Sequence, residues 1–314
     1  MMEKHRKIIV ILGPTACGKT TLAVALARRL GGAVISADSR QVYRGLDIGS
    51  GKDISEYTQG GEPVMTRLLD IADPAAGEQY SLSDFMRDSK EAIRELDSLG
   101  KIPILCGGTG LYIHALIKGY ELPGGPADRA FRNSVKHTDP AELAARVNQP
   151  LTNGEDTNPY RLSRRIEIAS APVLSPYGGP LENAEYFVLG AYRPREEIHR
   201  RIEKRLDERL AHGMLEEIQN LHDRAGVSWE RLAAFGLEYR EVSRFLQGEL
   251  PFQEMRDHLL VKIRQFAKRQ DTWFRKMQKE GVEIHWISPD RVDEAEALCR
   301  AFLGQSMETG STSR

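Results

Sequence analysis

The sequence predicts an α/β fold, in which a parallel sheet carries helices on both faces and a small, mainly helical insertion is added. Three observations predict it. Short apolar runs alternate with helix-length amphipathic segments through the first third of the 314 residues, as in βα repeats. A glycine-rich turn joins the first run to the first helix. From residue 123 to 157 the alternation is lost among Pro and Gly turn signals, which leave room for only a short helix near 142–148.

The first part of the core, residues 1–122, is expected to hold most of the sheet. The run 8–12 is continuously apolar, which is typical of a strand buried on both faces. Ser81 and Asp84 have the spacing of a capping box, which predicts the start of a helix. The expected elements are strands at 8–12, 33–36, 64–69 and 102–106, and helices at 20–30 and 82–99.

The remainder of the core is expected over residues 158–290, followed by a C-terminal tail over 291–314. A strand is predicted at 186–191, and one long helix at 196–221, because apolar residues recur there at helical spacing. A final basic helix at 255–279 and an alternating strand at 282–287 follow. Residues 307–314 are rich in Ser, Thr and Gly, so this end is expected to be frayed.

Composition excludes several classes of protein. The 44 Lys and Arg residues nearly cancel the 45 Asp and Glu residues, so net charge does not indicate a nucleic-acid or membrane partner and any basic site must be local. The longest apolar run near the N-terminus is 8–12, too short for a signal peptide core of about 7–15 residues or a membrane span of about 20. The three cysteines show no metal or disulfide spacing, which favours a reducing cytoplasm.

Residues 13–20 fill the pattern G-x-x-x-x-G-K-T between a strand and a helix, the context of a phosphate-binding loop (P-loop). Its two glycines allow the backbone N–H groups to point inward, Lys19 adds a charge, and the Thr20 hydroxyl could complete the shell of a Mg²⁺ ion. The loop predicts a P-loop NTPase-like core and a di- or triphosphate ligand. It leaves ATPase, kinase and diphosphate-releasing transferase open. The expected ligand contacts are Gly13, Pro14, Thr15, Ala16, Cys17, Gly18, Lys19 and Thr20.

Polar groups follow two further predicted strands, at the sheet edge where α/β proteins build their sites. Asp38 follows the second strand and is a candidate base facing the phosphate loop, although Asp in that position is also a common turn or helix cap. Thr109 follows a later strand, within a glycine-rich turn.

Basic residues concentrate in two places. Three arginines occur in residues 160–165, and residues 256–279 hold eight Lys and Arg against two Asp. One face of that helix is apolar and another is basic, so it could pack and also meet phosphates, although a charged face is usually only solvated.

Together these segments resemble the tRNA dimethylallyltransferases, also called tRNA isopentenyltransferases, of the bacterial type without a zinc finger. The resemblance runs from about residue 8 to 280. It rests on the phosphate loop, on S-A-D-S-R-Q-V-Y at 36–43, D-I-A-D-P at 70–74, G-G-T-G-L-Y at 107–112 and K-R-Q-D-T-W-F-R at 268–275. It implies transfer of a dimethylallyl group from dimethylallyl diphosphate to N6 of adenosine 37, in tRNAs that read codons starting with U, with release of diphosphate.

The resemblance also implies residue roles. Asp38 matches the general base, Thr109 would position the target nucleotide or the bridging oxygen, and Lys19 would hold the diphosphate with Mg²⁺ at Thr20. The implied tRNA contacts are Asp38, Ser39, Arg40, Gln41, Thr109, Tyr160, Arg161, Arg164, Gly236, Tyr239, Arg240, Lys268, Arg269, Gln270, Thr272, Trp273 and Arg275. The implied partners are dimethylallyl diphosphate and the anticodon stem-loop, which the insertion at 123–157 would also contact, and we expect a monomer that does not bind membranes.

The sequence departs from the family pattern at several points. Cys17 stands at a usual Ser, G-S-G-K at 49–52 replaces G-T-A-K, Thr66-Arg67 replaces two histidines, Tyr160 replaces Gln, and the insertion is shorter than usual. Three alternatives remain: an isopentenyltransferase acting on free adenine nucleotides, a P-loop kinase of small molecules, and a nucleic-acid-binding module whose loop is only structural.

Overall fold

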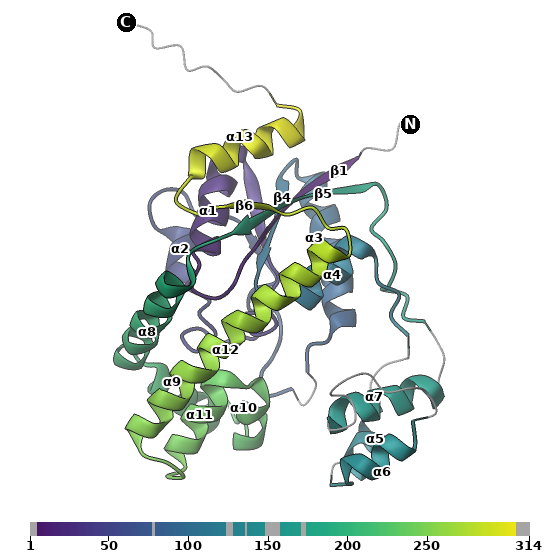
Figure 1. Ribbon diagram of the computed structural model, residues 1–314, viewed down its shortest axis with the longest axis vertical. Helices are drawn as coiled ribbons and strands as arrows, with labels where there is room; N and C mark the ends of the chain where they lie inside the picture. The colour runs from purple at the N-terminus through teal and green to yellow at the C-terminus, as the bar shows by residue number, and fades with distance from the viewer. Residues whose placement is uncertain are drawn as a thin grey trace, which may run out of the picture. The chain divides into compact units, whose positions relative to one another are not determined.

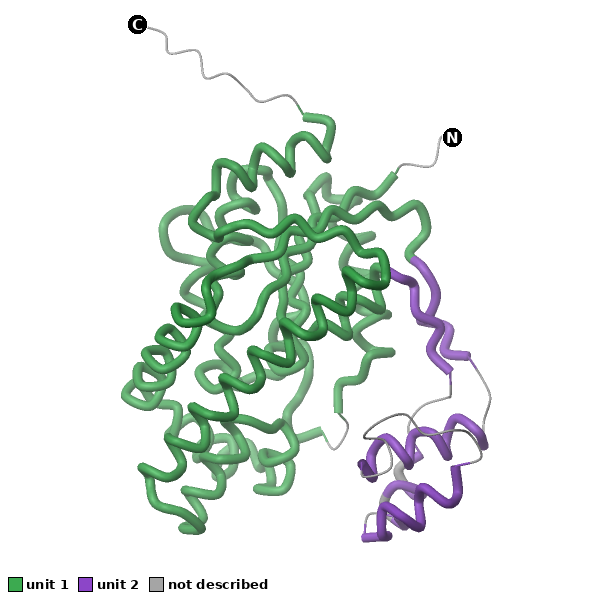
Figure 2. The backbone as a smooth tube through the Cα atoms, in the orientation of Figure 1, with its two compact units in different colours: residues 1–117, 181–314 green, residues 118–180 purple. Residues whose placement is uncertain are grey.

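The computed structural model describes residues 5–76, 79–123, 128–135, 137–147, 158–170 and 174–305. The chain divides into two compact units (Figure 2): unit 1 comprises residues 1–117 and 181–314, and unit 2 comprises residues 118–180. The insertion expected at 123–157 lies inside unit 2. The four-part division expected from the sequence stays a prediction.

Unit 1 contains a six-stranded sheet in which every strand pair is parallel, in the order β3-β2-β4-β1-β5-β6. Figure 1 labels β4, β1, β5 and β6 of this sheet. Leu12, at the end of β1, lies opposite Gly107 of β4 and Gly190 of β5, so these strands end together. The strands are β1 Arg6–Leu12, β2 Gly32–Ser36, β3 Thr66–Arg67, β4 Ile102–Gly107, β5 Ala184–Ala191 and β6 His285–Ile287.

Helices cover both faces of this sheet, as predicted. Ile9 and Ile11 of β1 pack in one apolar cluster with α1, Lys19–Leu30, and α13, Val292–Leu303. The alternate residues Ile8 and Val10 are also fully buried, so the opposite face is covered too. Further helices of this part of the chain are α2 Ile54–Thr58, α3 Leu82–Ser98 and α4 Gly110–Lys118.

The capping box at the start of α3 is confirmed. The Ser81 side chain accepts a hydrogen bond from the Asp84 N–H at 3.2 Å, and the Asp84 carboxylate accepts one from the Ser81 N–H at 2.9 Å. Residues 292–303, expected in a C-terminal tail, form α13, while residues 307–314 lie outside the described residues.

A helical layer follows β5 and packs around its own apolar cluster. The single helix expected at 196–221 is wrong, because the structure has two helices with a break at His212–Gly213. Gly213 has φ 101°, a backbone conformation that ends a helix and that glycine adopts without strain. The apolar stripe continues across the break, so its spacing could not reveal it. The helices of this layer are α8 Arg195–Ala211, α9 Met214–Asp223, α10 Trp229–Phe235, α11 Leu237–Leu246 and α12 Phe252–Lys279.

Two predicted strands are shorter than expected. The run 64–69 contributes only Thr66–Arg67, because Leu68 and Asp70 adopt positive φ angles of 62° and 56°. The run 282–287 contributes only His285–Ile287.

The described residues of unit 2 form three short helices: α5 Arg129–Ser134, α6 Pro140–Ala145 and α7 Pro159–Ser170. The helix expected near 142–148 corresponds to α6, which begins after Asp139, a cap whose carboxylate accepts the Ala141 N–H at 2.8 Å. The small apolar core of unit 2 is formed by Val135, Leu143 and Leu162. Across the described residues of both units, no helix is long and apolar enough to cross a membrane.

Candidate active site

The carboxyl ends of β1, β2 and β4 open into a cavity of about 540 Å³ in unit 1, which we call the candidate active site. Its wall is formed by three segments after these strands, by residues 49–53, and by α8, the α10–α11 region and α12. Many residues implied by the sequence line it: Thr15, Lys19, Thr20, Asp38, Ser39, Arg40, Gln41, Thr109, Gly236, Tyr239, Arg240, Arg269 and Gln270.

The phosphate loop connects β1 to α1 through a tight backbone path. Gly18 has φ 98° and Ala16 has φ 62°. A Cβ on Gly13 would lie 2.7 Å from Cys17 Sγ and 2.8 Å from the Ala191 carbonyl oxygen, so only glycine fits there. Cys17, at the position of the family's serine, is buried inside the loop.

Two arginines that the sequence analysis missed hold carbonyl groups of this loop. Arg193 Nε donates to the Cys17 carbonyl and Arg201 Nε donates to the Ala16 carbonyl, each at 2.8 Å. In the part of the chain that the structure describes, no hydrogen bond occupies the backbone N–H groups of Gly18 or Thr20, while the Lys19 N–H faces the Cys17 side chain. The loop therefore presents donors and the start of α1 to an anion.

Asp38 and Thr109 face the loop from neighbouring strand ends. Asp38 Oδ1 accepts the N–H groups of Arg40 at 2.8 Å and Gln41 at 3.4 Å, so the turn-capping role is present. Its other carboxylate oxygen has no hydrogen bond to any described residue. Thr109 Oγ1 accepts the Ser39 N–H at 3.1 Å, which leaves its own proton available to a ligand. Asp38 can thus cap the turn and still accept a proton.

The glycines around Thr109 are required by close packing. A Cβ on Gly107 would lie 2.2 Å from the Ala37 carbonyl oxygen, and one on Gly110 would lie 2.4 Å from Trp273 Cδ1. The turn is therefore pressed against β2 on one side and α12 on the other, which fixes the Thr109 hydroxyl near Asp38.

Arginines of α8 form a second missed feature of the cavity. Arg205 forms an ion pair with Asp53, and Arg209 lies 3.7 Å from Glu238. Burial raises the pKa of Glu238, and Arg209 opposes that rise. Arg201, Arg205 and Arg209 recur every four residues and so share one face of α8; this basic stripe beside the apolar one was a signal available in the sequence.

Several implied tRNA contacts also shape the loop at 47–51. Gln41 donates to the Gly51 carbonyl at 3.1 Å, and Tyr239, which is buried, donates to Glu217 at 3.1 Å. Glu217 in turn accepts the Gly49 N–H at 3.0 Å. Burial raises the pKa of Glu217.

The segment G-S-G-K at 49–52 departs from the family pattern G-T-A-K but retains its lysine, and this lysine has a structural role. Lys52 is fully buried and its Nζ contacts the carboxylates of Asp47 and Asp70 and the Tyr43 carbonyl. Asp70 of the D-I-A-D-P motif thus serves this cluster.

Other predicted site residues lie outside the candidate active site. In unit 2, Arg164 pairs with Glu167 at 3.1 Å, and the Tyr160 ring lies 4.8 Å from the Arg132 guanidinium carbon. Arg161 is exposed on the same helix, α7.

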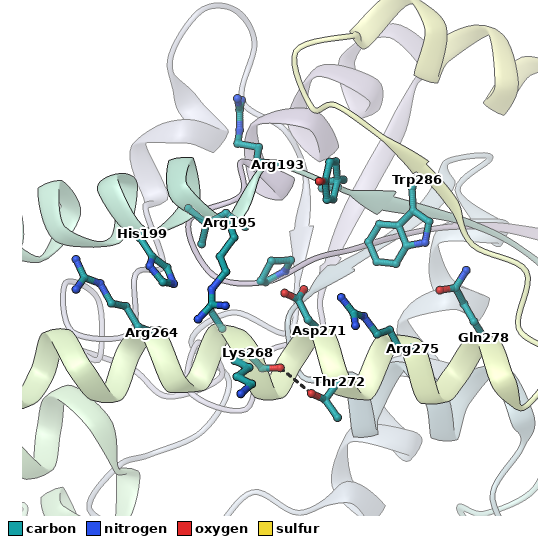
Figure 3. A pocket seen from close by; sticks show the side chains of 15 residues that line it. Arg193, Arg195, His199, Arg264, Lys268, Asp271, Thr272, Arg275, Gln278 and Trp286 are labelled. Carbon is teal, nitrogen blue, oxygen red and sulfur yellow. Dashed lines mark hydrogen bonds between the residues drawn. The ribbon is translucent and has the colours of Figure 1, made fainter.

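Pro14, Lys268, Thr272 and Arg275 instead line a second cavity on another face of α12 (Figure 3), where Thr272 Oγ1 donates to the Lys268 carbonyl at 2.9 Å. Trp273 packs on Gly110.

Fold and site define a P-loop α/β protein in which a carboxylate and a hydroxyl face an anion-binding loop. A family model described as "IPP transferase" matches residues 41–277, and one described as "Isopentenyl transferase" matches residues 6–67. The chain belongs to the IPP transferase family and is a prenyltransferase.

Curated relatives match nearly the whole chain. "tRNA dimethylallyltransferase 1" of Hahella chejuensis is 42% identical, covering 93% of this chain and 96% of its own length. "tRNA dimethylallyltransferase 2" of Trichlorobacter lovleyi is 45% identical, with coverages of 89% and 91%.

Solved structures agree in fold. The full-length tRNA isopentenylpyrophosphate transferase of Bacillus halodurans superposes with a TM-score of 0.70 at 31% identity, covering 96% of this chain and 97% of its own. A eukaryotic dimethylallyltransferase acting on tRNA has a TM-score of 0.70 at 21% identity, with coverages of 97% and 81%, a likeness of fold.

Proposed function

We propose that this protein transfers a dimethylallyl group from dimethylallyl diphosphate to N6 of adenosine 37 in tRNAs that read codons starting with U. The observation that carries the proposal is the placement of Asp38 and Thr109 across one cavity from the donor-lined loop of residues 13–20. The names of relatives at 42–45% identity support prenyl transfer to tRNA over phosphoryl transfer.

The loop and its arginines suit a diphosphate leaving group. The free N–H groups of Gly18 and Thr20 and the Lys19 ammonium would bind its oxygens, and they would stabilise the negative charge that develops as the C–O bond breaks. Arg193 and Arg201 keep the loop in the conformation that presents these donors.

Thr20 fits a Mg²⁺ ion in the usual manner of this loop, because Thr20 lines the cavity beside Lys19 and carries a hydroxyl oxygen. When bound, the ion would neutralise charge on the diphosphate. Among the described residues no group of three acidic, His or Cys side chains could hold a metal by itself, so the ligand oxygens would have to complete the shell.

Asp38 supplies a base that can take a proton from the adenine N6 amine. The N6 lone pair is delocalised into the ring, so attack becomes easier when a base removes a proton. A bond forms between N6 and C1 of the dimethylallyl group, the bond from C1 to the diphosphate oxygen breaks, and the N6 proton passes to Asp38. Thr109 would orient the nucleotide or the bridging oxygen through its available O–H.

The setting proposed for this reaction is a cytoplasmic monomer that binds the anticodon stem-loop. The three cysteines are buried free thiols, which suits a reducing compartment. Contacts from α7 of unit 2 and from the basic helix α12 would hold the RNA.

Labelled dimethylallyl diphosphate supplied with tRNA, AMP or neither tests the proposal. Label should appear in tRNA and be absent when A37 is replaced. Label in AMP alone would assign the protein to the free-nucleotide type. Phosphoryl transfer from ATP without prenyl transfer would contradict the proposal in favour of a kinase.

A further inference from the structure

The three arginines on one face of α8, Arg201, Arg205 and Arg209, have different surroundings. Arg201 is bound to the phosphate loop through the Ala16 carbonyl. Arg205 and Arg209 both line the candidate active site, one helical turn apart. Holding the phosphate loop does not require Arg209, and neither does the transfer of a proton from N6.

Arg209 is a nearly buried guanidinium without a close partner. Its side chain is 16% exposed, and its ion pair with Glu238 is 3.7 Å long, which exceeds hydrogen-bond distance. In the part of the chain that the structure describes, no hydrogen bond joins the Arg209 side chain to another residue, whereas Arg205 is held by Asp53. A polar group that leaves water needs new acceptors to offset the loss of hydration. The donors of Arg209 are therefore available to an acceptor inside the cavity.

A glycine makes the space that the Arg209 guanidinium occupies. Gly51 is the third residue of G-S-G-K, where the family pattern G-T-A-K has alanine. A Cβ on Gly51 would lie 2.8 Å from Arg209 Cζ and closer still to Nη2. Alanine at position 51 and this placement of the guanidinium therefore exclude each other, and the glycine admits the arginine to the wall of the cavity.

The charge of Arg209 lies beside a like charge. Burial lowers the pKa of Arg209, and the positive charge of Arg205 lowers it further, while Glu238 opposes the shift. Arg205 is within electrostatic reach of the phosphate loop because it opposes, as Lys19 does, the rise in the pKa of the Cys17 thiol that burial causes. An anion that is bound at the loop and extends along α8 would offset the repulsion between the two arginines.

We propose that Arg209 is a further binding residue for the diphosphate group of dimethylallyl diphosphate, and that Gly51 is the residue that allows it to reach this group. One phosphate would lie on the loop N–H groups and Lys19, and the other would accept hydrogen bonds from Arg209. A planar guanidinium can donate two parallel hydrogen bonds to one phosphate. The inference rests on the proposed function, from which it takes its ligand.

Calorimetric titration with inorganic diphosphate, the product of the reaction, in the presence of Mg²⁺ tests the proposal. Arg209→Gln should weaken diphosphate binding by about tenfold, because the variant loses its charge-assisted hydrogen bonds to the phosphate. Glu238→Gln should bind diphosphate at least as tightly as the wild type, since it removes the carboxylate that competes for the guanidinium. The double variant should bind as weakly as Arg209→Gln. If Arg209 serves only to neutralise Glu238, the double variant will instead recover wild-type affinity, and the proposal is overturned.

Gly51→Ala tests the proposal without removing the arginine, so it also serves if Arg209→Gln does not fold. The added methyl group displaces the guanidinium, and diphosphate affinity should again fall by about tenfold. In the Arg209→Gln background the same substitution should cause no further loss of affinity. Alanine at the positive φ of 65° lowers stability in both backgrounds alike. Two losses of affinity that multiply in the double variant would show that Gly51 and Arg209 act independently, against the proposal.

Arg200→Gln is the matched control, because it removes an exposed arginine of α8 that does not line the cavity. It should bind diphosphate as the wild type does. The KM for dimethylallyl diphosphate should rise in Arg209→Gln while tRNA affinity stays close to wild type; a loss of tRNA affinity with unchanged diphosphate affinity would overturn the proposal.

The two proposals fail in different ways. A protein that binds diphosphate through Arg209 and transfers no dimethylallyl group would contradict the proposed function alone. The inference about Arg209 is overturned if the wild type does not bind diphosphate, or if Arg209→Gln and the wild type bind it equally in an enzyme that prenylates tRNA.

Discussion

Gln270 Oε1 accepts a hydrogen bond from the Thr15 backbone N–H at 2.8 Å, although 255 residues separate them in the chain. The same amide donates through Nε2 to the Gly108 carbonyl at 2.9 Å. One buried side chain of α12 therefore ties the phosphate loop to the turn that carries Thr109. The K-R-Q segment thus has a structural reason to accompany the loop, besides any contact with RNA.

Gln270→Ala should loosen this connection. Two backbone groups lose their partner in a site where the side chain is only 6% exposed, so the free energy of unfolding should fall by about 1–3 kcal/mol. Urea unfolding measures this, and the KM for dimethylallyl diphosphate should rise as the loop loses its fixed position. Gln253→Ala, on the exposed start of α12, is the control and should change stability by only a few tenths of a kcal/mol. Equal stability of the two variants would contradict the linking role of Gln270.

The substitution Asp38→Asn tests the role of Asp38 as a base separately from its role in capping the turn. The amide oxygen can still accept the Arg40 N–H, so the fold around it should persist, while the variant can no longer take the N6 proton. The single-turnover rate should fall by about 10²–10⁴-fold with tRNA affinity mostly unchanged. Asp38→Ala should lose the same rate and also some stability. Near-wild-type turnover in the Asn variant would mean that Asp38 only caps the turn.

The sequence predicts the parts of this site that are contiguous in the chain. The phosphate loop, Asp38 and Thr109 each follow a strand, and the common edge of a parallel sheet brings them together. The contacts that could not be predicted join residues that lie far apart in the chain and that only tertiary packing brings together. Arg193 and Arg201 hold loop carbonyls from more than 170 residues away.

The break at Gly213 illustrates another limit. The apolar stripe of α8 resumes in α9, so its period predicts one helix, while the positive φ of Gly213 depends on how the chain folds back. Strand β3 was expected to be longer because Leu68 and Leu69 are apolar. The positive φ of Leu68 instead directs the chain away from the sheet, and Asp70 forms an ion pair with Lys52.

Lys52→Met tests the buried cluster behind the loop at 47–51. The substitution leaves Asp47, Asp70 and the Tyr43 carbonyl without their shared partner. Because both carboxylates are partly exposed and can regain water, the loss should be about 1–3 kcal/mol, below the roughly 3–5 kcal/mol of a fully buried pair. Chemical unfolding of Lys52→Met and of the exposed control Lys204→Met measures it; an equal effect of both would contradict the role of the cluster.

Lys19→Ala should affect one substrate far more than the other. The ammonium group adds charge to an anion-binding loop, so the KM for dimethylallyl diphosphate should rise by at least tenfold while tRNA binding stays close to wild type. Initial rates at varied donor concentration, together with filter binding of tRNA, give the comparison. An equal loss of tRNA affinity would place Lys19 in the RNA site instead.

The basic face of α12 should hold tRNA phosphates. Lys268 and Arg275 are exposed on this helix, in a chain whose net charge is only −1, so neutralising both as Gln should weaken tRNA binding for every substrate sequence. The slope of log affinity against log salt should flatten by about 0.7 for each single-strand phosphate that is no longer neutralised, or about 0.9 for each duplex phosphate by the DNA scale. Dimethylallyl diphosphate binding should change little, because Lys19 and Thr20 line the other cavity.

The pair Arg200→Gln and Lys204→Gln on exposed α8 positions removes the same charge elsewhere and controls for net charge. If the α12 and α8 double variants show the same affinity and the same slope as the wild type, this helix face is only solvated, and the RNA must be held by another surface.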